Sequence, residues 1–128
     1  MSKALMQEVF PEMQTEIEQA YQLAQQDELI QAEEIYHDIL QQQANYPPAL
    51  YGLATLADKI NDQEVKEDLL RRAIEQIKDS DDRNKKGLEA IWLTELAEAL
   101  IRQGRQDDAK ECIDGSKRII RENLAVDT

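Results

Sequence analysis

Residues 16–54 read EIEQAYQLAQQDELIQAEEIYHDILQQQANYPPALYGLA, and this stretch decides the fold. Ala20 lies in one amphipathic run and Tyr36 in the next, and in both runs apolar residues recur every three or four positions. Two prolines ending at Pro48 interrupt the chain, and a third run that contains Ala54 follows them. Ala20 and Ala54 are 34 residues apart, the length of a repeat unit of two helices and a turn. The stretch therefore predicts a helical repeat.

The whole chain of 128 residues has the composition of one all-α domain. Only four glycines and three prolines interrupt it, and aromatic residues make up 5%, which suits a core of Leu, Ile and Ala. The apolar periodicity predicts helices at about 11–26, 29–43, 48–60, 64–78, 85–103 and 106–123. We expect a short arm at 1–10, packed on the repeats or loose, and a tail at 124–128.

Single residues refine these boundaries. Gly104 follows the last apolar residue of the fifth run, a common place for glycine to end a helix. Gly115 lies inside the sixth run, where it costs about 1 kcal/mol relative to alanine. The apolar stripes of the third and fourth runs include Ile60 and Val65. Trp92 is expected in the core.

The runs resemble the tetratricopeptide-repeat family. The family has small residues where paired helices cross and a large apolar or aromatic residue in the second helix. In the first and third units the small residues are Ala20, Ala32, Ala97 and Ala109, and the large ones are Tyr36 and Ile113. The middle unit departs from the pattern, because Lys66 stands where a small alanine is expected. The resemblance implies an all-α fold of three stacked antiparallel helical hairpins. These would form a right-handed α-solenoid over 11–123, with units at about 13–46, 47–80 and 85–123.

A function in protein–protein interaction follows from the same resemblance. The first helix of each unit would line a concave groove that binds a partner peptide or helix, so that the protein acts as an adaptor. The residues that the resemblance places toward the ligand are Gln14, Ile17, Tyr21, Gln25, Tyr51, Thr55, Lys59, Glu95, Glu98, Ile101 and Arg102. Ile17 and Tyr21 replace a lysine-and-asparagine clamp that some members use for a C-terminal carboxylate. We therefore expect apolar anchors at Tyr21 and Tyr51 rather than an acidic tail.

Two alternatives to an adaptor are open. The first is a self-associating structural or assembly protein, such as a homodimer, held together by the apolar arm or the last helix. The second is a chaperone for a secreted partner, because small acidic repeat proteins resemble the secretion chaperones of bacteria.

The charge distribution limits the class of partner. The formal net charge is −12, and residues 1–58 contribute −9 of it. Such a field repels nucleic acid and anionic lipid, so we expect a basic or amphipathic protein partner. No apolar run approaches the roughly 18 residues of a membrane span. We also find no signal-peptide pattern, and a single cysteine favours a reducing cytoplasm.

Catalytic signals are weak. Glu34 and His37 have the Glu-x-x-His spacing of di-iron bundles, but such a site needs a second histidine and the chain has one. Cys112 lies in an apolar stripe, which is typical of a core cysteine. Glu95 and Glu98 are paired carboxylates on one predicted helix, where solvated charge is the simpler interpretation. Phosphate-loop and nucleophile-elbow motifs are missing from the sequence. We therefore expect neither an enzyme nor a bound cofactor or metal.

Overall fold

The computed structural model describes the backbone of residues 2–124 and the side chains of residues 3–123, and all its regular structure is helical. The elements are α1 (Ser2–Val9), α2 (Gln14–Gln25), α3 (Leu29–Gln42), α4 (Pro47–Lys59), α5 (Gln63–Glu75), α6 (Arg83–Arg102), α7 (Gln106–Ile119) and the π-helical turn η1 (Ile120–Leu124). The predicted all-α class is confirmed over this range. Of the predicted tail, 125–128 lies outside the described residues.

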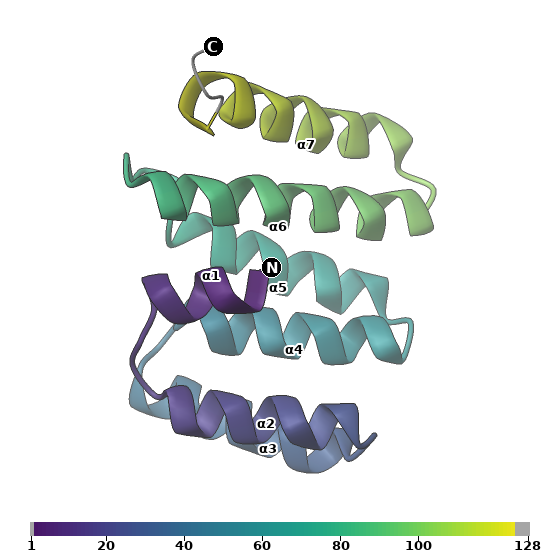
Figure 1. Cartoon of the computed structure of the whole chain (residues 1–128). Coiled ribbons are helices and arrows are strands. Elements are labelled where there is room, and N and C mark those ends of the chain that lie inside the picture. Colours follow the sequence, from purple (N-terminus) through teal and green to yellow (C-terminus); the bar gives the residue numbers. More distant parts are fainter. Residues whose placement is uncertain (1, 125–128) are drawn as a thin grey trace.

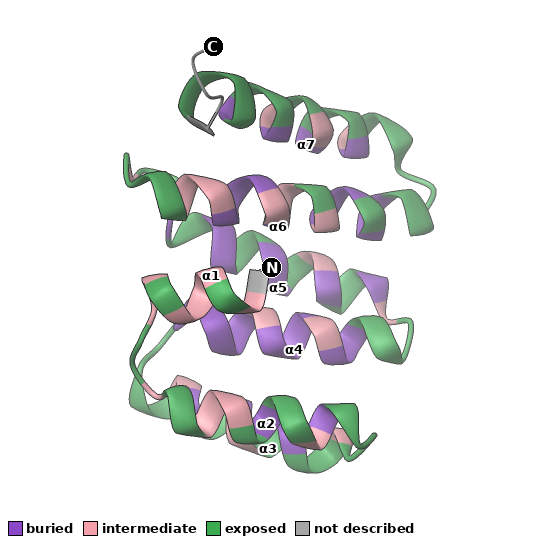
Figure 2. Ribbon diagram, in the orientation of Figure 1, coloured by how far each residue is buried: buried purple, intermediate pink, exposed green. Residues whose placement is uncertain are grey.

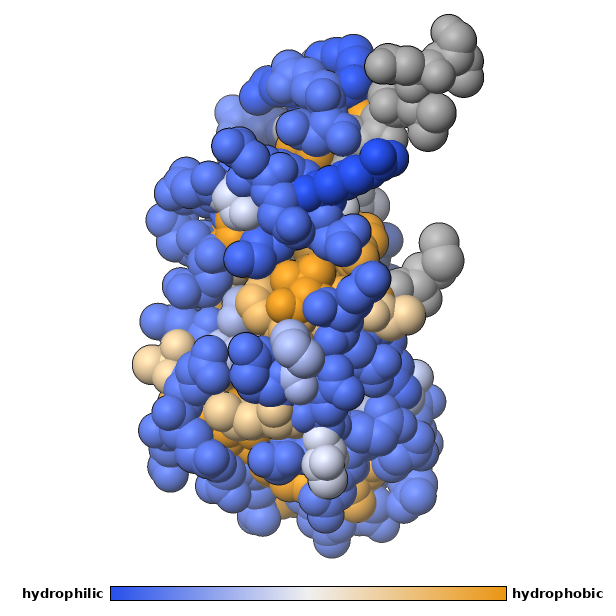
Figure 3. All heavy atoms as spheres, turned by 60° about the vertical axis from the view of Figure 1, so that its left-hand side comes forward, coloured by the Kyte–Doolittle hydropathy of each residue, from blue (hydrophilic) through white to orange (hydrophobic). Residues whose placement is uncertain are grey.

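The helices from α2 to α7 form a pile in which each one packs against the next along the chain (Figure 1). Small and aliphatic side chains fill the spaces between them, and α4 is the most enclosed helix (Figure 2). Trp92 is fully buried, as predicted. Hydrophilic residues dominate the surface seen in Figure 3, with apolar patches between them. Within the described part of the chain, every helix is too short or too polar to span a membrane.

The same turn follows α2, α4 and α6. In each case the second residue after the helix has a left-handed backbone: Asp27 (φ 64°), Asn61 (φ 61°) and Gly104 (φ 78°). The next residue donates its backbone N–H to the carbonyl five residues earlier, at 2.8, 2.8 and 2.9 Å, which is the Schellman arrangement. Asp27 and Asn61 are 34 residues apart, as are Ala20 and Ala54. The spacing seen in the sequence therefore recurs in the backbone.

Some predicted boundaries are wrong. The first predicted helix begins at Gln14 rather than residue 11, because Met13 has a left-handed backbone (φ 58°) that an α-helix cannot contain. The fourth ends at Glu75 instead of 78. The sixth continues through Gly115 but is α-helical only to Ile119, after which η1 continues it.

Of the predicted N-terminal arm, residues 2–9 form α1, which is packed on the rest of the fold, and residue 1 lies outside the described residues. Leu5, Met6, Val9 and Phe10 are partly buried against the core. Helix α1 packs against α6, and Lys3 forms an ion pair with Glu18 of α2 at 2.9 Å. The arm thus bridges the first and last thirds of the pile.

Candidate protein-binding surfaces

All the residues predicted to face a ligand belong to α2, α4 and α6, and the surface that these three helices form is here called the first-helix face. These three helices adjoin: α2 packs against α4, and Tyr51 of α4 stacks on Trp92 of α6 with ring centroids 5.8 Å apart. Because α1 contacts both α2 and α6, it lies across this face (Figure 1).

Polar and cation–π contacts hold α1 to α2. Lys3 Nζ lies 3.9 Å from the centroid of the Tyr21 ring and 2.9 Å from Glu18 Oε2. Hydrogen bonds from Gln22 and then Lys3 lower the pKa of Glu18 below its usual value. Gln14 Nε2 donates to the carbonyl of Gln7 at 3.0 Å. Two predicted ligand-facing residues, Gln14 and Tyr21, therefore contact the chain's own N-terminal helix.

A buried tyrosine fixes the connection between α1 and α2. The Tyr46 hydroxyl donates to the Glu12 carbonyl at 2.6 Å and lies 3.1 Å from the Phe10 carbonyl. The Phe10 and Tyr46 rings meet edge to face with centroids 5.9 Å apart. Burial raises the pKa of Tyr46 to about 12, so its hydroxyl remains a donor at neutral pH. Tyr46, which directly precedes α4, thus holds the segment that follows α1 in place.

Three more predicted residues meet at the centre of the face. The Tyr51 hydroxyl donates to Glu95 Oε1 at 2.9 Å, and the Thr55 hydroxyl donates to the Gly52 carbonyl at 2.7 Å. Tyr51, Thr55 and Glu95 line a cavity of about 40 Å³. Burial raises the pKa of Glu95 despite the hydrogen bond from Tyr51. These side chains are therefore engaged within the fold rather than free for a ligand.

Lys66, at the position where the repeat pattern expects alanine, is buried in the same region. Its side chain is 6% exposed, and Nζ lies 3.1 Å from Asp58 Oδ1 and 4.0 Å from Glu98 Oε2. Burial opposes ionisation of Asp58, but hydrogen bonds from Gln63 and Lys66 outweigh it and lower the pKa of this carboxyl. A lysine in place of the expected alanine was the only sign in the sequence that Lys66 is unusual. The burial of Lys66 depends on Asp58 in α4 and Glu98 in α6.

The remaining predicted residues are not brought together into one site. Ile17 is half-buried against the core. The exposed ones are Gln25, Lys59, Glu98, Ile101 and Arg102.

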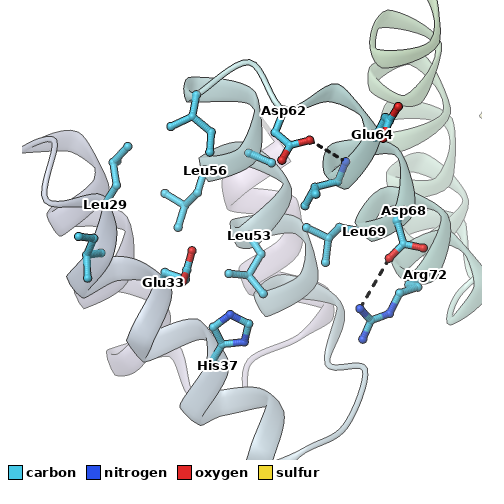
Figure 4. Close-up of a pocket in the computed structure, with 14 residues that line it drawn as sticks. Leu29, Glu33, His37, Leu53, Leu56, Asp62, Glu64, Asp68, Leu69 and Arg72 are labelled. Atoms are coloured by element: carbon cyan, nitrogen blue, oxygen red, sulfur yellow. Dashed lines mark hydrogen bonds and ion pairs between the residues drawn. The ribbon is translucent and has the colours of Figure 1, made fainter. Parts of the chain in front are cut away.

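A second surface was not predicted from the sequence. Helices α3, α4 and α5 enclose a groove of about 690 Å³, here called the lateral groove (Figure 4). Ile30, Ile60 and Val65 line it, and they are 76%, 67% and 45% exposed. The predicted apolar stripes included Ile60 and Val65, but both are exposed, because no helix of the described chain covers them. Periodicity identifies the apolar side of a helix without showing whether a neighbour packs there.

No family model, curated protein or solved structure matches this chain. The resemblance to tetratricopeptide repeats therefore stays a prediction.

Possible metal ligands and the single cysteine are the remaining groups to consider. Among them, no group of three or more His, Cys, Asp or Glu side chains could hold a metal ion. Cys112 is buried, as predicted, and burial raises the pKa of its thiol. A thiol kept protonated in this way is a poor nucleophile.

Proposed function

We propose that the protein is a protein-interaction adaptor that binds a helical segment of a partner on its first-helix face. Its architecture would be three tetratricopeptide-like hairpins stacked as a right-handed superhelix. Support for the repeat comes from the three equivalent turns and from the alanines at matched positions. Ala20, Ala32, Ala54, Ala97 and Ala109 are each at most 2% exposed, as close helix crossings require. The chain has a single cysteine and so cannot form an internal disulfide, and the proposal therefore includes a location in the reducing cytoplasm.

The observation that carries the binding proposal is α1 itself. This helix precedes the repeats and lies across α2 and α6 with an apolar row and one cation, Lys3, over the Tyr21 ring. None of the four apolar side chains of that row is fully buried. A partner helix with a similar apolar row and a cation in the place of Lys3 could therefore replace α1. The first-helix face would then be available to the partner in proportion to how often α1 is undocked.

A peptide of residues 2–10 tests this proposal. The free peptide must compete with the chain's own tethered α1, whose effective concentration is of millimolar order, so its apparent affinity for the wild type is low. The ¹⁵N-labelled full chain is therefore titrated with the peptide and followed by NMR, which detects weak binding. A full-length Leu5→Asp variant, in which the chain's own α1 docks poorly, should bind the peptide at least tenfold more tightly than the wild type. Adding Tyr21→Ala to that variant should abolish the gain.

The matched control adds Ile120→Ala instead, since this exposed side chain belongs to η1 and no predicted ligand-facing residue lies there. The peptide should bind the control as it binds Leu5→Asp alone. Equal peptide affinity for the wild type and Leu5→Asp, or no effect of Tyr21→Ala, would contradict the proposal.

A further inference from the structure

The lateral groove is separate from the first-helix face and has its own chemistry. Its walls come from α3 and α5 and its floor from α4, and Leu53, Leu56 and Leu69 form much of the apolar lining (Figure 4). Three further apolar side chains, Ile30, Ile60 and Val65, remain largely in water. Apolar side chains that line a surface groove and remain exposed are typical of a binding surface.

The rim of this groove is negatively charged. Four carboxylates surround it, those of Glu33, Asp62, Glu64 and Asp68, against one guanidinium, that of Arg72. Asp62 accepts the backbone N–H of Val65 at 3.3 Å and caps α5, and Asp68 lies 4.0 Å from Arg72. Glu33 and Glu64 lie on different helices, α3 and α5, so the negative charge flanks the apolar strip on both sides.

We propose that the lateral groove is a second docking site, which takes an amphipathic helix of a partner protein with an apolar face flanked by lysine or arginine. Leucine-type side chains at helical spacing would fill the groove and supply affinity, as in helix-in-groove recognition. The basic flanks would face Glu33 and Glu64, where exposed charge mainly accelerates association and selects the partner.

A second copy of this chain fits the groove less well. In a two-fold contact the same surface meets itself, so the acidic rim of one copy would face the acidic rim of the other. The net charge of −12 adds to that repulsion. Charge complementarity thus favours a cationic partner over self-association.

A synthetic helix of leucine and lysine, about four turns long, serves as the probe. Its binding to the full chain is measured by fluorescence anisotropy, next to a peptide of identical composition whose order destroys the apolar face. We expect the amphipathic peptide to bind at least tenfold more tightly than the reordered one. Val65→Asp and Ile60→Asp should each weaken it at least tenfold.

The matched control is Ile101→Asp. Ile101 is 45% exposed, as Val65 is, but it lies on α6 in the first-helix face. It also adds the same negative charge, so a purely electrostatic effect of the new aspartate appears equally in both variants. Thermal melts of all variants check that each one is folded. The combined change Glu33→Lys and Glu64→Lys should slow association, and the effect should shrink with added salt.

Several results would overturn the inference. Unchanged or equally tighter binding by Val65→Asp and Ile101→Asp would show general attraction between a cation and an acidic protein, because each variant adds one negative charge. A loss only in Ile101→Asp would assign the helix to the first-helix face, which supports the proposed function and removes the second site. A wild-type dimer by sedimentation that Val65→Asp dissociates would assign the groove to a second copy.

Discussion

Gly52→Ala is expected to destabilise the fold, although alanine is the better helix former. In the middle of α4 the substitution would on its own gain about 1 kcal/mol. A Cβ at this position, however, would lie 2.7 Å from Cε2 of Tyr36 and closer still to Cζ and Cε1. Tyr36 is 4% exposed, so its ring cannot move away into solvent. Overpacking of this kind costs about 1–3 kcal/mol, and contacts this short place the cost at the upper end.

The net loss in the free energy of unfolding is therefore about 2 kcal/mol, which for a chain of this size lowers Tm by roughly 8 °C. Gly115→Ala is the matched control, because it also lies within a helix and its new Cβ would be 3.6 Å from Leu93, an ordinary contact. We expect the control to gain about 0.5–1 kcal/mol. Urea denaturation and calorimetry measure both variants.

A double-mutant cycle shows whether the cost comes from the ring. Tyr36→Leu should cancel much of the penalty of Gly52→Ala, giving a coupling energy of about 1 kcal/mol or more. If Gly52→Ala were as stabilising as Gly115→Ala, the packing of α3 on α4 described above would be wrong.

Three further predictions concern buried polar groups. Burial raises the pKa of Glu95, so this carboxyl binds a proton more tightly in the folded state than in the unfolded state. The free energy of unfolding should therefore fall as pH rises from the ordinary glutamate pKa through the raised one. Glu95→Gln should remove this contribution and raise Tm at pH 7, and an unchanged pH dependence would contradict the burial. Tyr46→Phe should cost about 1 kcal/mol in urea denaturation, because the Glu12 carbonyl loses its 2.6 Å donor. The raised pKa and burial of Cys112 predict slow reaction with a thiol reagent at pH 8 and fast reaction in denaturant, and equal rates would place the thiol in solvent.

The features predicted correctly from the sequence depend on local chemistry. Gly104 ends α6 as expected, since a left-handed backbone after a helix favours glycine. The 34-residue spacing of Ala20 and Ala54 recurs in the turns at Asp27 and Asn61, because small residues at helix crossings recur with the unit that contains them. Met13 carried no such signal, since nothing about a methionine predicts a left-handed backbone at φ 58°.

The features that were missed or left open depend on contacts between distant segments. The burial of Lys66 depends on carboxylates in α4 and α6, and the docking of α1 depends on a tyrosine in α2 and on α6. Of the predicted ligand-facing residues, Tyr51, Thr55 and Glu95 do meet, but they bond within the fold. The lateral groove could not be derived from periodicity, because it arises where no helix covers an apolar stripe.

Paramagnetic relaxation enhancement tests the central claim, that the first-helix face binds a helix and that α1 occupies it, most directly. A nitroxide is attached at Ala4→Cys, an exposed position of α1, in a chain carrying Cys112→Ala. The account predicts broadening of the backbone amides of Glu18 and Tyr21, and recovery of these signals when excess unlabelled peptide of residues 2–10 displaces α1. Sharp amide signals at Glu18 and Tyr21 from the start, or broadening that persists at saturating peptide, would contradict the account.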